Sequence, residues 1–67
     1  MTVADRMRKT LVETKTVSVQ LEQFALDTEN KQAKQLYRVL ARKSGDIASV
    51  LQTRILALEQ EEEQYKS

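Results

Sequence analysis

Residues 25–34 read Ala25-Leu26-Asp27-Thr28-Glu29-Asn30-Lys31-Gln32-Ala33-Lys34, and this stretch decides the fold. Apolar side chains recur at helical spacing on both sides of it, whereas residues 27–30 are all polar. Asp, Thr and Asn favour turns and helix caps because their side chains bond to nearby backbone groups. A short connection makes two helices antiparallel neighbours. The sequence therefore predicts an all-α fold, a two-helix antiparallel hairpin that forms a single domain over residues 1–67.

Capping residues indicate where the two helices begin. Thr2 followed by Asp5 resembles a capping box, and Thr28 or Asn30 is placed to cap the second helix. No glycine closes the first helix, so Asn30 is the candidate for a left-handed residue. We expect helix 1 over residues 3–27 and helix 2 over residues 31–62. A break at Gly45 is the alternative for helix 2, but the apolar phase continues through it, which favours one helix weakened by about 1 kcal/mol.

Each helix carries an apolar stripe in which spacings of three and four residues alternate, the a/d pattern of coiled coils. The stripe of helix 1 is Ala4, Met7, Leu11, Thr14, Ser18, Leu21, Ala25 and Thr28. The stripe of helix 2 is Ala33, Tyr37, Leu40, Ser44, Ile47, Leu51, Arg54 and Leu58. Leu36, Val50 and Ala57 widen the second stripe on one side, and Ala41, Ala48 and Ile55 widen it on the other.

A turn near residue 28 also predicts which residues face each other. The expected pairs are Leu21 with Leu36 and Tyr37, Val17 with Leu40, Thr14 with Ser44, Leu11 with Ile47, and Met7 with Leu51. Thr14 and Ser44 either form a polar layer between the helices or bond to carbonyls of their own helix. Leu58 and Tyr65 are expected to extend beyond the start of helix 1.

The composition indicates that a lone hairpin is not the whole assembly. The chain has 67 residues and no Cys, so disulfides do not stabilise it, and small folds of this kind often oligomerise. The face of helix 2 is wide enough for two neighbours, which predicts a homodimer that forms a four-helix bundle. The expected self-association residues are Leu36, Tyr37, Val50, Ile55 and Leu58.

A second apolar stripe on helix 1 stands apart from the first. It contains Val12, Val19 and Leu26 at seven-residue spacing. Single exposed apolar residues are common on protein surfaces, so one interpretation gives these three no role. The other interpretation is a second contact face for another subunit.

Charged residues cluster at both ends of helix 2, although the net charge is only +1. Lys31, Lys34, Arg38 and Arg42 share one face. They either contact an anionic partner such as nucleic acid or form a solvated face paired with acids of helix 1 (Glu22, Asp27 and Glu29). No aromatic residue interleaves them as a base-stacking site requires. The acidic run Glu59-Gln60-Glu61-Glu62-Glu63 is expected near Arg6, Arg8 and Lys9.

The residue types exclude most catalytic chemistry. The chain has no His and no Cys, the commonest general base and thiol nucleophile, and its single Gly excludes phosphate-binding loops. We therefore expect no enzyme activity, no cofactor and no metal site. No segment is apolar enough to span a membrane, and the first residues lack a signal peptide, which predicts a cytoplasmic protein.

Several segments resemble one known family. They are Met-Thr-Val at the start, Leu21-Glu22-Gln23-Phe24-Ala25-Leu26-Asp27-Thr28, Gln32-Ala33-Lys34-Gln35-Leu36-Tyr37, and Glu61-Glu62-Glu63-Gln64-Tyr65-Lys66. They look like the short proteins catalogued as domain of unknown function 1657, from endospore-forming Bacillus relatives. The resemblance implies a sporulation context, with a forespore or spore location, and it implies no reaction and no ligand. Lys43-Ser44-Gly45-Asp46 looks atypical for this family.

Together these observations predict a non-enzymatic, self-associating structural or adaptor protein. One alternative is a nucleic-acid-binding module that uses the four basic residues of early helix 2. Another is a peripheral membrane protein in which Val17, Leu21 and Phe24 of helix 1 insert into lipid.

Overall fold

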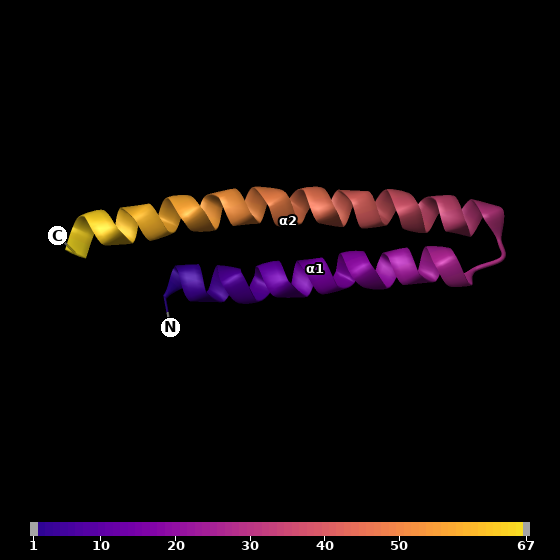
Figure 1. The fold of residues 1–67 in the computed structure, drawn as a ribbon, viewed down its shortest axis with the longest axis horizontal. Coiled ribbons are helices and arrows are strands. Elements are labelled where there is room, and N and C mark those ends of the chain that lie inside the picture. The colour runs from indigo at the N-terminus through magenta and orange to yellow at the C-terminus, as the bar shows by residue number, and fades with distance from the viewer. Residues whose placement is uncertain (1, 67) are drawn as a thin grey trace.

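The computed structural model describes residues 2–66, and the side chains of residues 2–63. Helix α1 spans Val3–Asp27, helix α2 spans Lys31–Lys66, and residues 28–30 connect them. The helices run antiparallel beside each other in a rod of 56 × 17 × 11 Å, and α2 extends past the beginning of α1 (Figure 1). Residues 2–66 contain no strand, so the predicted all-helical architecture with two helices is confirmed.

Both helices begin where their caps predict. The Thr2 hydroxyl accepts a hydrogen bond from the Asp5 amide at 3.1 Å, and the Asp5 carboxylate accepts one from the Thr2 amide at 3.3 Å. At the start of α2, the Asn30 side-chain oxygen accepts from the Ala33 amide at 3.0 Å. Each cap satisfies amide groups that have no partner inside the helix. The expected starts and the end of helix 1 are confirmed, but α2 ends at Lys66 rather than at residue 62.

The connection does not use a left-handed residue. Thr28 is extended, with φ −80° and ψ 139°, and its amide donates to the Phe24 carbonyl oxygen at 3.0 Å. No residue in the described part of the chain has a positive φ, so the expectation of a left-handed Asn30 is wrong. Extended Thr28 ends α1 by itself, and Asn30 is already the cap of α2.

Among the side chains that the structure describes, five form the buried contact between the helices, and four of these five belong to alanines. They are Ala4, Ala25, Ala41, Ala48 and Ile55. On α1 every member of the predicted stripe is buried or half-buried, from Ala4 to Thr28. α2 also continues as one helix through Gly45, as the uninterrupted apolar phase predicts.

On α2 the predicted stripe is wrong at three positions. The sequence places Leu40, Ile47 and Arg54 in the contact, but all three are exposed. The residues that follow them, Ala41, Ala48 and Ile55, are buried instead. A helix rotated this way brings small side chains to its neighbour and leaves the Arg54 guanidinium in water, where its charge stays hydrated.

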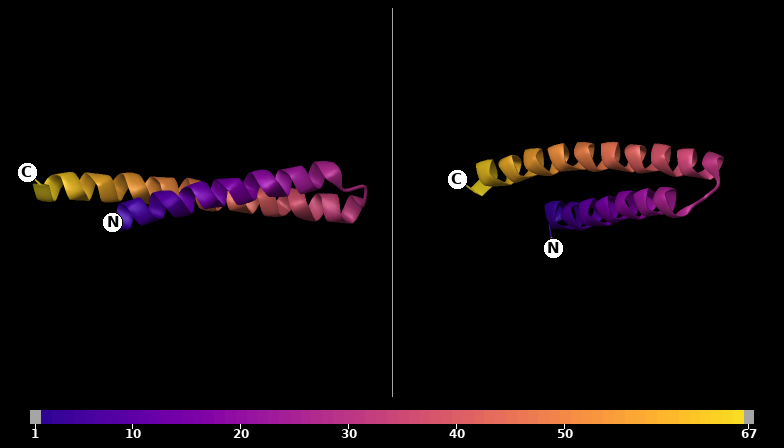
Figure 2. Two further views of the ribbon diagram at one scale, coloured as in Figure 1. Left: turned by 90° about the horizontal axis from the view of Figure 1, so that it is seen from below. Right: turned by 45° about the vertical axis from the view of Figure 1, so that its right-hand side comes forward.

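The register is also displaced from the expected one by about one helical turn, or 3.6 residues. The ring of Tyr37 packs edge-on against Phe24, with centroids 5.8 Å apart, rather than against Leu21. Ser18 lies between Ala41 and Gly45. An extended residue advances the chain by about 3.3 Å, against 1.5 Å in a helix, so the connection carries the beginning of α2 beyond the end of α1 (Figure 1). From this beginning the helices cross at a shallow angle (Figure 2).

Candidate interaction surfaces

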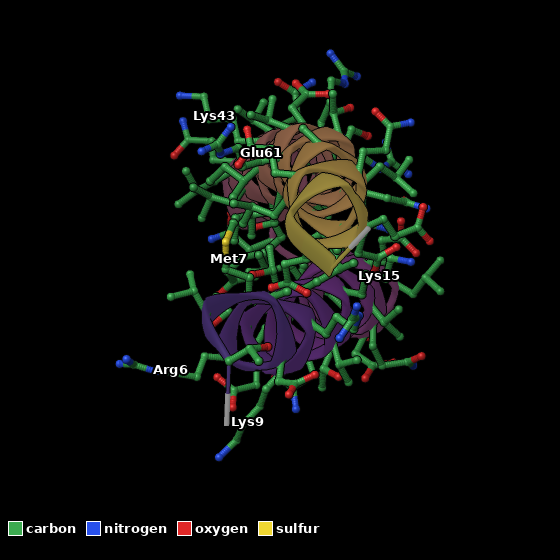
Figure 3. The ribbon with its side chains drawn as sticks, turned by 90° about the vertical axis from the view of Figure 1, so that its left-hand side faces the viewer. Arg6, Met7, Lys9, Lys15, Lys43 and Glu61 are labelled. Atoms are coloured by element: carbon green, nitrogen blue, oxygen red, sulfur yellow. The ribbon has the colours of Figure 1, made fainter. Side chains whose placement is uncertain are left out.

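The two open sides of the hairpin differ in chemistry. Viewed along the rod, Met7 and Lys43 lie on one side and Lys15 lies on the other (Figure 3). The side of Lys15 carries the cross-helix ion pair of Arg8 with Glu59, and it has shallow depressions around Ser18 and Gly45. We call it the polar side.

The side of Met7 carries most of the exposed large apolar residues. Helical spacing assigns seven of these residues to this side, three on α1 and four on α2. We call the surface that they form the broad apolar face. Its members are Val3, Val17, Phe24, Leu36, Leu40, Ile47 and Val50. Half-buried Met7, Leu21 and Leu51 lie between the two helices beneath them.

The residues expected to mediate self-association do not all reach this face. Leu36 and Val50 lie on it and are 54% and 70% exposed. Tyr37 and Leu58 are half-buried at its inner edge, where Tyr37 contacts Phe24. Ile55 is only 5% exposed because it packs against α1. Ile55 therefore belongs to the contact inside the hairpin. The side chain of Tyr65 lies outside the described residues.

Val12, Val19 and Leu26 form the third surface, which we call the α1 outer stripe. They are 63%, 63% and 69% exposed. Their positions lie about 100° around α1 from the buried Ala4 and Ala25, so they occupy the flank of α1 opposite the broad apolar face. Val19 also lines the shallow depression beside Gly45 and Ala48 of α2. A shallow, mostly apolar depression runs along Val12, Lys15, Thr16, Val19 and Gln20.

One ion-pair cluster joins the beginning of α1 to the end of α2. Arg8 donates from Nε to Glu59 Oε1 at 3.1 Å and also from Nη2 to the same oxygen, while its Nη1 contacts Asp5 Oδ1 at 2.7 Å. The hydrogen bond to Glu59 raises the pKa of Arg8. Hydrogen bonds with the Thr2 backbone and hydroxyl, and then the charge of Arg8, lower the pKa of Asp5. The expected proximity of Arg8 to the acidic run is confirmed.

The basic residues of early α2 are not paired in the expected way. Among residues 2–63, no acidic oxygen lies within 4.0 Å of the charged nitrogens of Lys31, Lys34, Arg38 or Arg42. Arg38 and Arg42 share a depression on the polar side with Glu22. Asp27 and Glu29, which lie in the same described range, form no ion pair with these four residues.

Sequence reasoning missed a side-chain hydrogen bond that joins the middles of the helices. The Ser18 hydroxyl donates to the Ala41 carbonyl oxygen at 3.0 Å. Thr14 donates to the Thr10 carbonyl oxygen of its own helix at 2.8 Å, which is one of the two alternatives that the sequence offered for it. A serine on an apolar stripe opposite alanine and glycine is the signal for such a bond, because only small residues let a short hydroxyl reach the neighbouring backbone.

Two other kinds of site are absent from the described residues. No group of three or more Asp, Glu, His or Cys side chains there is arranged to hold a metal ion. Neither helix, over the same residues, has an apolar stretch long enough to cross a lipid bilayer.

The comparisons with known proteins place the chain in a family. The sequence model of a family described as "Protein of unknown function (DUF1657)" matches residues 7–55. The chain belongs to the DUF1657 family. The match begins at Met7 and ends at Ile55, so it includes the turn, the α1 outer stripe and most of the broad apolar face, whereas the Glu-rich segment after residue 60 lies outside it. No curated protein and no solved structure matches the chain.

Proposed function

We propose that this DUF1657 protein is a non-enzymatic structural or adaptor protein that works as a homodimer. In this dimer the broad apolar faces of two hairpins pack together and form a four-helix bundle. The observation that carries the proposal is the distribution of side-chain size. Among residues 2–63, the contact inside the hairpin buries four alanines and one isoleucine, while twelve large apolar residues remain exposed.

The size of the face is consistent with a stable dimer. Its seven side chains are between 37% and 70% exposed. Complete burial of such a side chain contributes about 1.5–3 kcal/mol, so burial of the exposed half contributes about 5–10 kcal/mol per protomer. Two protomers together offset an association cost of about 4–15 kcal/mol. A hairpin of this length has little other means of stabilisation, since it contains neither Cys nor His.

Sedimentation equilibrium of the full chain at micromolar concentration tests the dimer. The wild type should sediment with twice the mass of the chain. Val50→Glu should give a monomer, because it places a charge on the broad apolar face and Val50 has no role inside the hairpin. Val39→Glu is the matched control on the outer side of α2, and it should remain a dimer. A folded wild-type monomer at this concentration would remove the proposal.

The cellular setting is part of the proposal and rests on the resemblance alone. We propose a cytoplasmic protein of a spore-forming cell, located in the forespore or spore. Immunofluorescence during sporulation tests this directly, and equal signal in vegetative and sporulating cells would contradict the spore setting.

A second function is favoured by the unpaired basic residues of early α2. Lys31, Lys34, Arg38 and Arg42 are placed to bind an anionic partner, and nucleic acid is the alternative that we propose. Binding of a labelled DNA duplex should then weaken steeply with salt, because binding releases counterions. Arg38→Glu should abolish retention, whereas Arg38→Lys should preserve it. No binding at low salt would eliminate this alternative.

A further inference from the structure

The α1 outer stripe remains exposed when the broad apolar face is covered. Val12, Val19 and Leu26 project from the flank of α1 opposite the broad apolar face and are each at least 63% exposed, although Val19 also lines the shallow depression beside Gly45 and Ala48 of α2. Their seven-residue spacing keeps the three side chains on one line along the helix. A straight line of this kind matches another helix that lies along it.

We propose that the α1 outer stripe binds the same stripe of a second copy of this chain, with the two α1 helices antiparallel and the Val19 residues facing each other across a two-fold axis. In this arrangement Val12 lies against Leu26 of the second copy, and Leu26 against Val12. All three apolar positions are then matched by apolar positions. This inference goes beyond the proposed four-helix bundle, since it uses a surface that the bundle leaves open.

The charges beside the stripe determine the direction of the second helix. Lys15 and Glu22 flank Val19 on the same edge of the stripe, and among residues 2–63 neither has an ion-pair partner within 4.0 Å. The antiparallel register about Val19 brings Lys15 of each copy opposite Glu22 of the other. A parallel two-fold arrangement would instead set this edge of each stripe against the opposite edge of the other, so that Lys15 and Glu22 would not meet.

Glu22 also has positively charged neighbours in its own chain, which could compete with Lys15 of the second copy for its carboxylate. Arg38 and Arg42 of α2 line the same depression as Glu22. They lie on the polar side, while the second copy approaches from the outer side of α1. Glu22 lies between these two directions, so its carboxylate remains within reach of a lysine from the second copy.

The stripe is smaller than a standard protein interface, which buries about 800 Å² on each partner. Three aliphatic residues per copy therefore give a weak contact. A four-helix bundle exposes two such stripes, one on each protomer. Each protomer then has two different two-fold contacts, one in the bundle and one at the stripe, so dimers can join into a longer chain. We therefore expect larger assemblies at high protein concentration.

Cysteine cross-linking of the full-length protein tests the contact, because the chain has no cysteine of its own. Under a mild oxidant, Val19→Cys should form a disulfide dimer at least about 10-fold faster than Val39→Cys, the matched control, since the contact raises the local thiol concentration. Circular dichroism first confirms that both variants are helical. Equal rates for the two variants would overturn the inference.

Two further variants test the register. Val12→Cys mixed with Leu26→Cys should give the mixed disulfide in preference to either homodimer. Preferential Val12–Val12 cross-linking would indicate parallel helices and overturn the inference. Glu22→Lys should slow the Val19→Cys cross-link, and the double change Lys15→Glu/Glu22→Lys should restore it, because the pair is then reversed rather than lost.

The experiment separates this contact from the four-helix bundle. Val19→Cys is also examined in the Val50→Glu background, where the proposed bundle is absent. Persistence of the fast cross-link there supports the stripe contact whether or not the bundle exists. If Val50→Glu no longer sediments as a dimer, the four-helix bundle is supported. If Val19→Cys then cross-links no faster than Val39→Cys, the stripe contact is overturned while the bundle proposal stands. Suppression of the cross-link by phosphatidylglycerol vesicles that bind the chain would assign the stripe to lipid and overturn the inference.

Discussion

The contact between the helices and the broad apolar face use opposite kinds of apolar residue. Inside the hairpin the buried residues are Ala4, Ala25, Ala41, Ala48 and Ile55. The broad apolar face carries Val, Leu, Ile and Phe side chains that are a third or more exposed. Small residues let two helix backbones approach closely, so that the Ser18 hydroxyl reaches the Ala41 carbonyl oxygen. The hairpin therefore leaves most of its large apolar side chains for a contact outside itself, as half of a larger bundle does.

Ile55 is the exception inside the contact, and its removal has the largest expected effect. Ile55→Ala should lower the free energy of unfolding by about 2–5 kcal/mol, because it removes the only large buried side chain that the contact has among residues 2–63. The neighbouring Leu56→Ala is the control, since Leu56 is exposed. It should change the free energy by about 0.5 kcal/mol or less. Thermal unfolding followed by circular dichroism compares them, and equal losses would contradict the rotation of α2 described above.

An added side chain at Ala48 tests the same contact from the opposite direction. Ala48→Leu should destabilise the hairpin by about 1–3 kcal/mol, because a leucine does not fit where the helices approach closely. Val39→Leu adds volume on the outer side of the same helix and should be nearly neutral. Urea unfolding measures both free energies. A neutral Ala48→Leu would show that the helices separate easily and that small residues are not required between them.

Gly45→Ala should have a smaller effect, and of the opposite sign. The nearest atom to an added Cβ is the Ser18 hydroxyl oxygen at 4.0 Å, an ordinary van der Waals distance. Alanine in place of glycine inside a helix should therefore stabilise the protein by about 0.5–1 kcal/mol. Gly45→Leu should lose this gain, because its longer side chain meets Ser18. Destabilisation by alanine, measured by thermal unfolding, would indicate that the helices lie closer together than described.

The sequence was sufficient for the helices and insufficient for their mutual rotation. Thr2, Asp5 and Asn30 located both helix starts because capping is a local interaction. The α1 stripe was also correct, since the arc that contains Ala4 and Leu11 carries more apolar residues than the separate stripe of Val12, Val19 and Leu26. On α2 two neighbouring apolar arcs could each contact α1. One contains Leu40 and Ile47, and the other contains Ala41 and Ala48. Hydrophobicity favours the first, and close packing selects the second.

The register of the two helices and the assignment of residues to surfaces were also only partly predictable from the sequence. The displacement by one turn follows from the extended conformation of Thr28, which no residue type in the turn specifies. Sequence reasoning found the exposed Leu36 and Val50, as well as Val12, Val19 and Leu26. It also assigned Ile55 to a surface, because the rotation of α2 decides whether Ile55 or Ile47 faces α1.

The smallest expected effect concerns the capping box at the beginning of α1, far from the contact of large residues. The pKa of Asp5 is lower in the folded chain than in the unfolded chain, chiefly because the Thr2 backbone and hydroxyl form hydrogen bonds with it. Its contribution is therefore fully present above the unfolded pKa, about 3.9, and is lost as the pH falls through the folded value. Because Asp5 lies at the chain end, protonation should unwind the first turn of α1 and leave the alanine contact intact.

NMR chemical shifts of residues 3–7 between pH 5 and pH 2 measure this unwinding. Asp5→Asn should remove the acid-dependent step, because it has no carboxylate to protonate. Glu59→Gln should retain the step, since the loss of the Arg8–Glu59 pair affects the cross-helix cluster and leaves the Thr2–Asp5 hydrogen bonds in place. If acid instead unfolds α1 and α2 together, the small residues between the helices are not sufficient to hold the hairpin, and the first turn contributes more to the fold than its exposed position indicates.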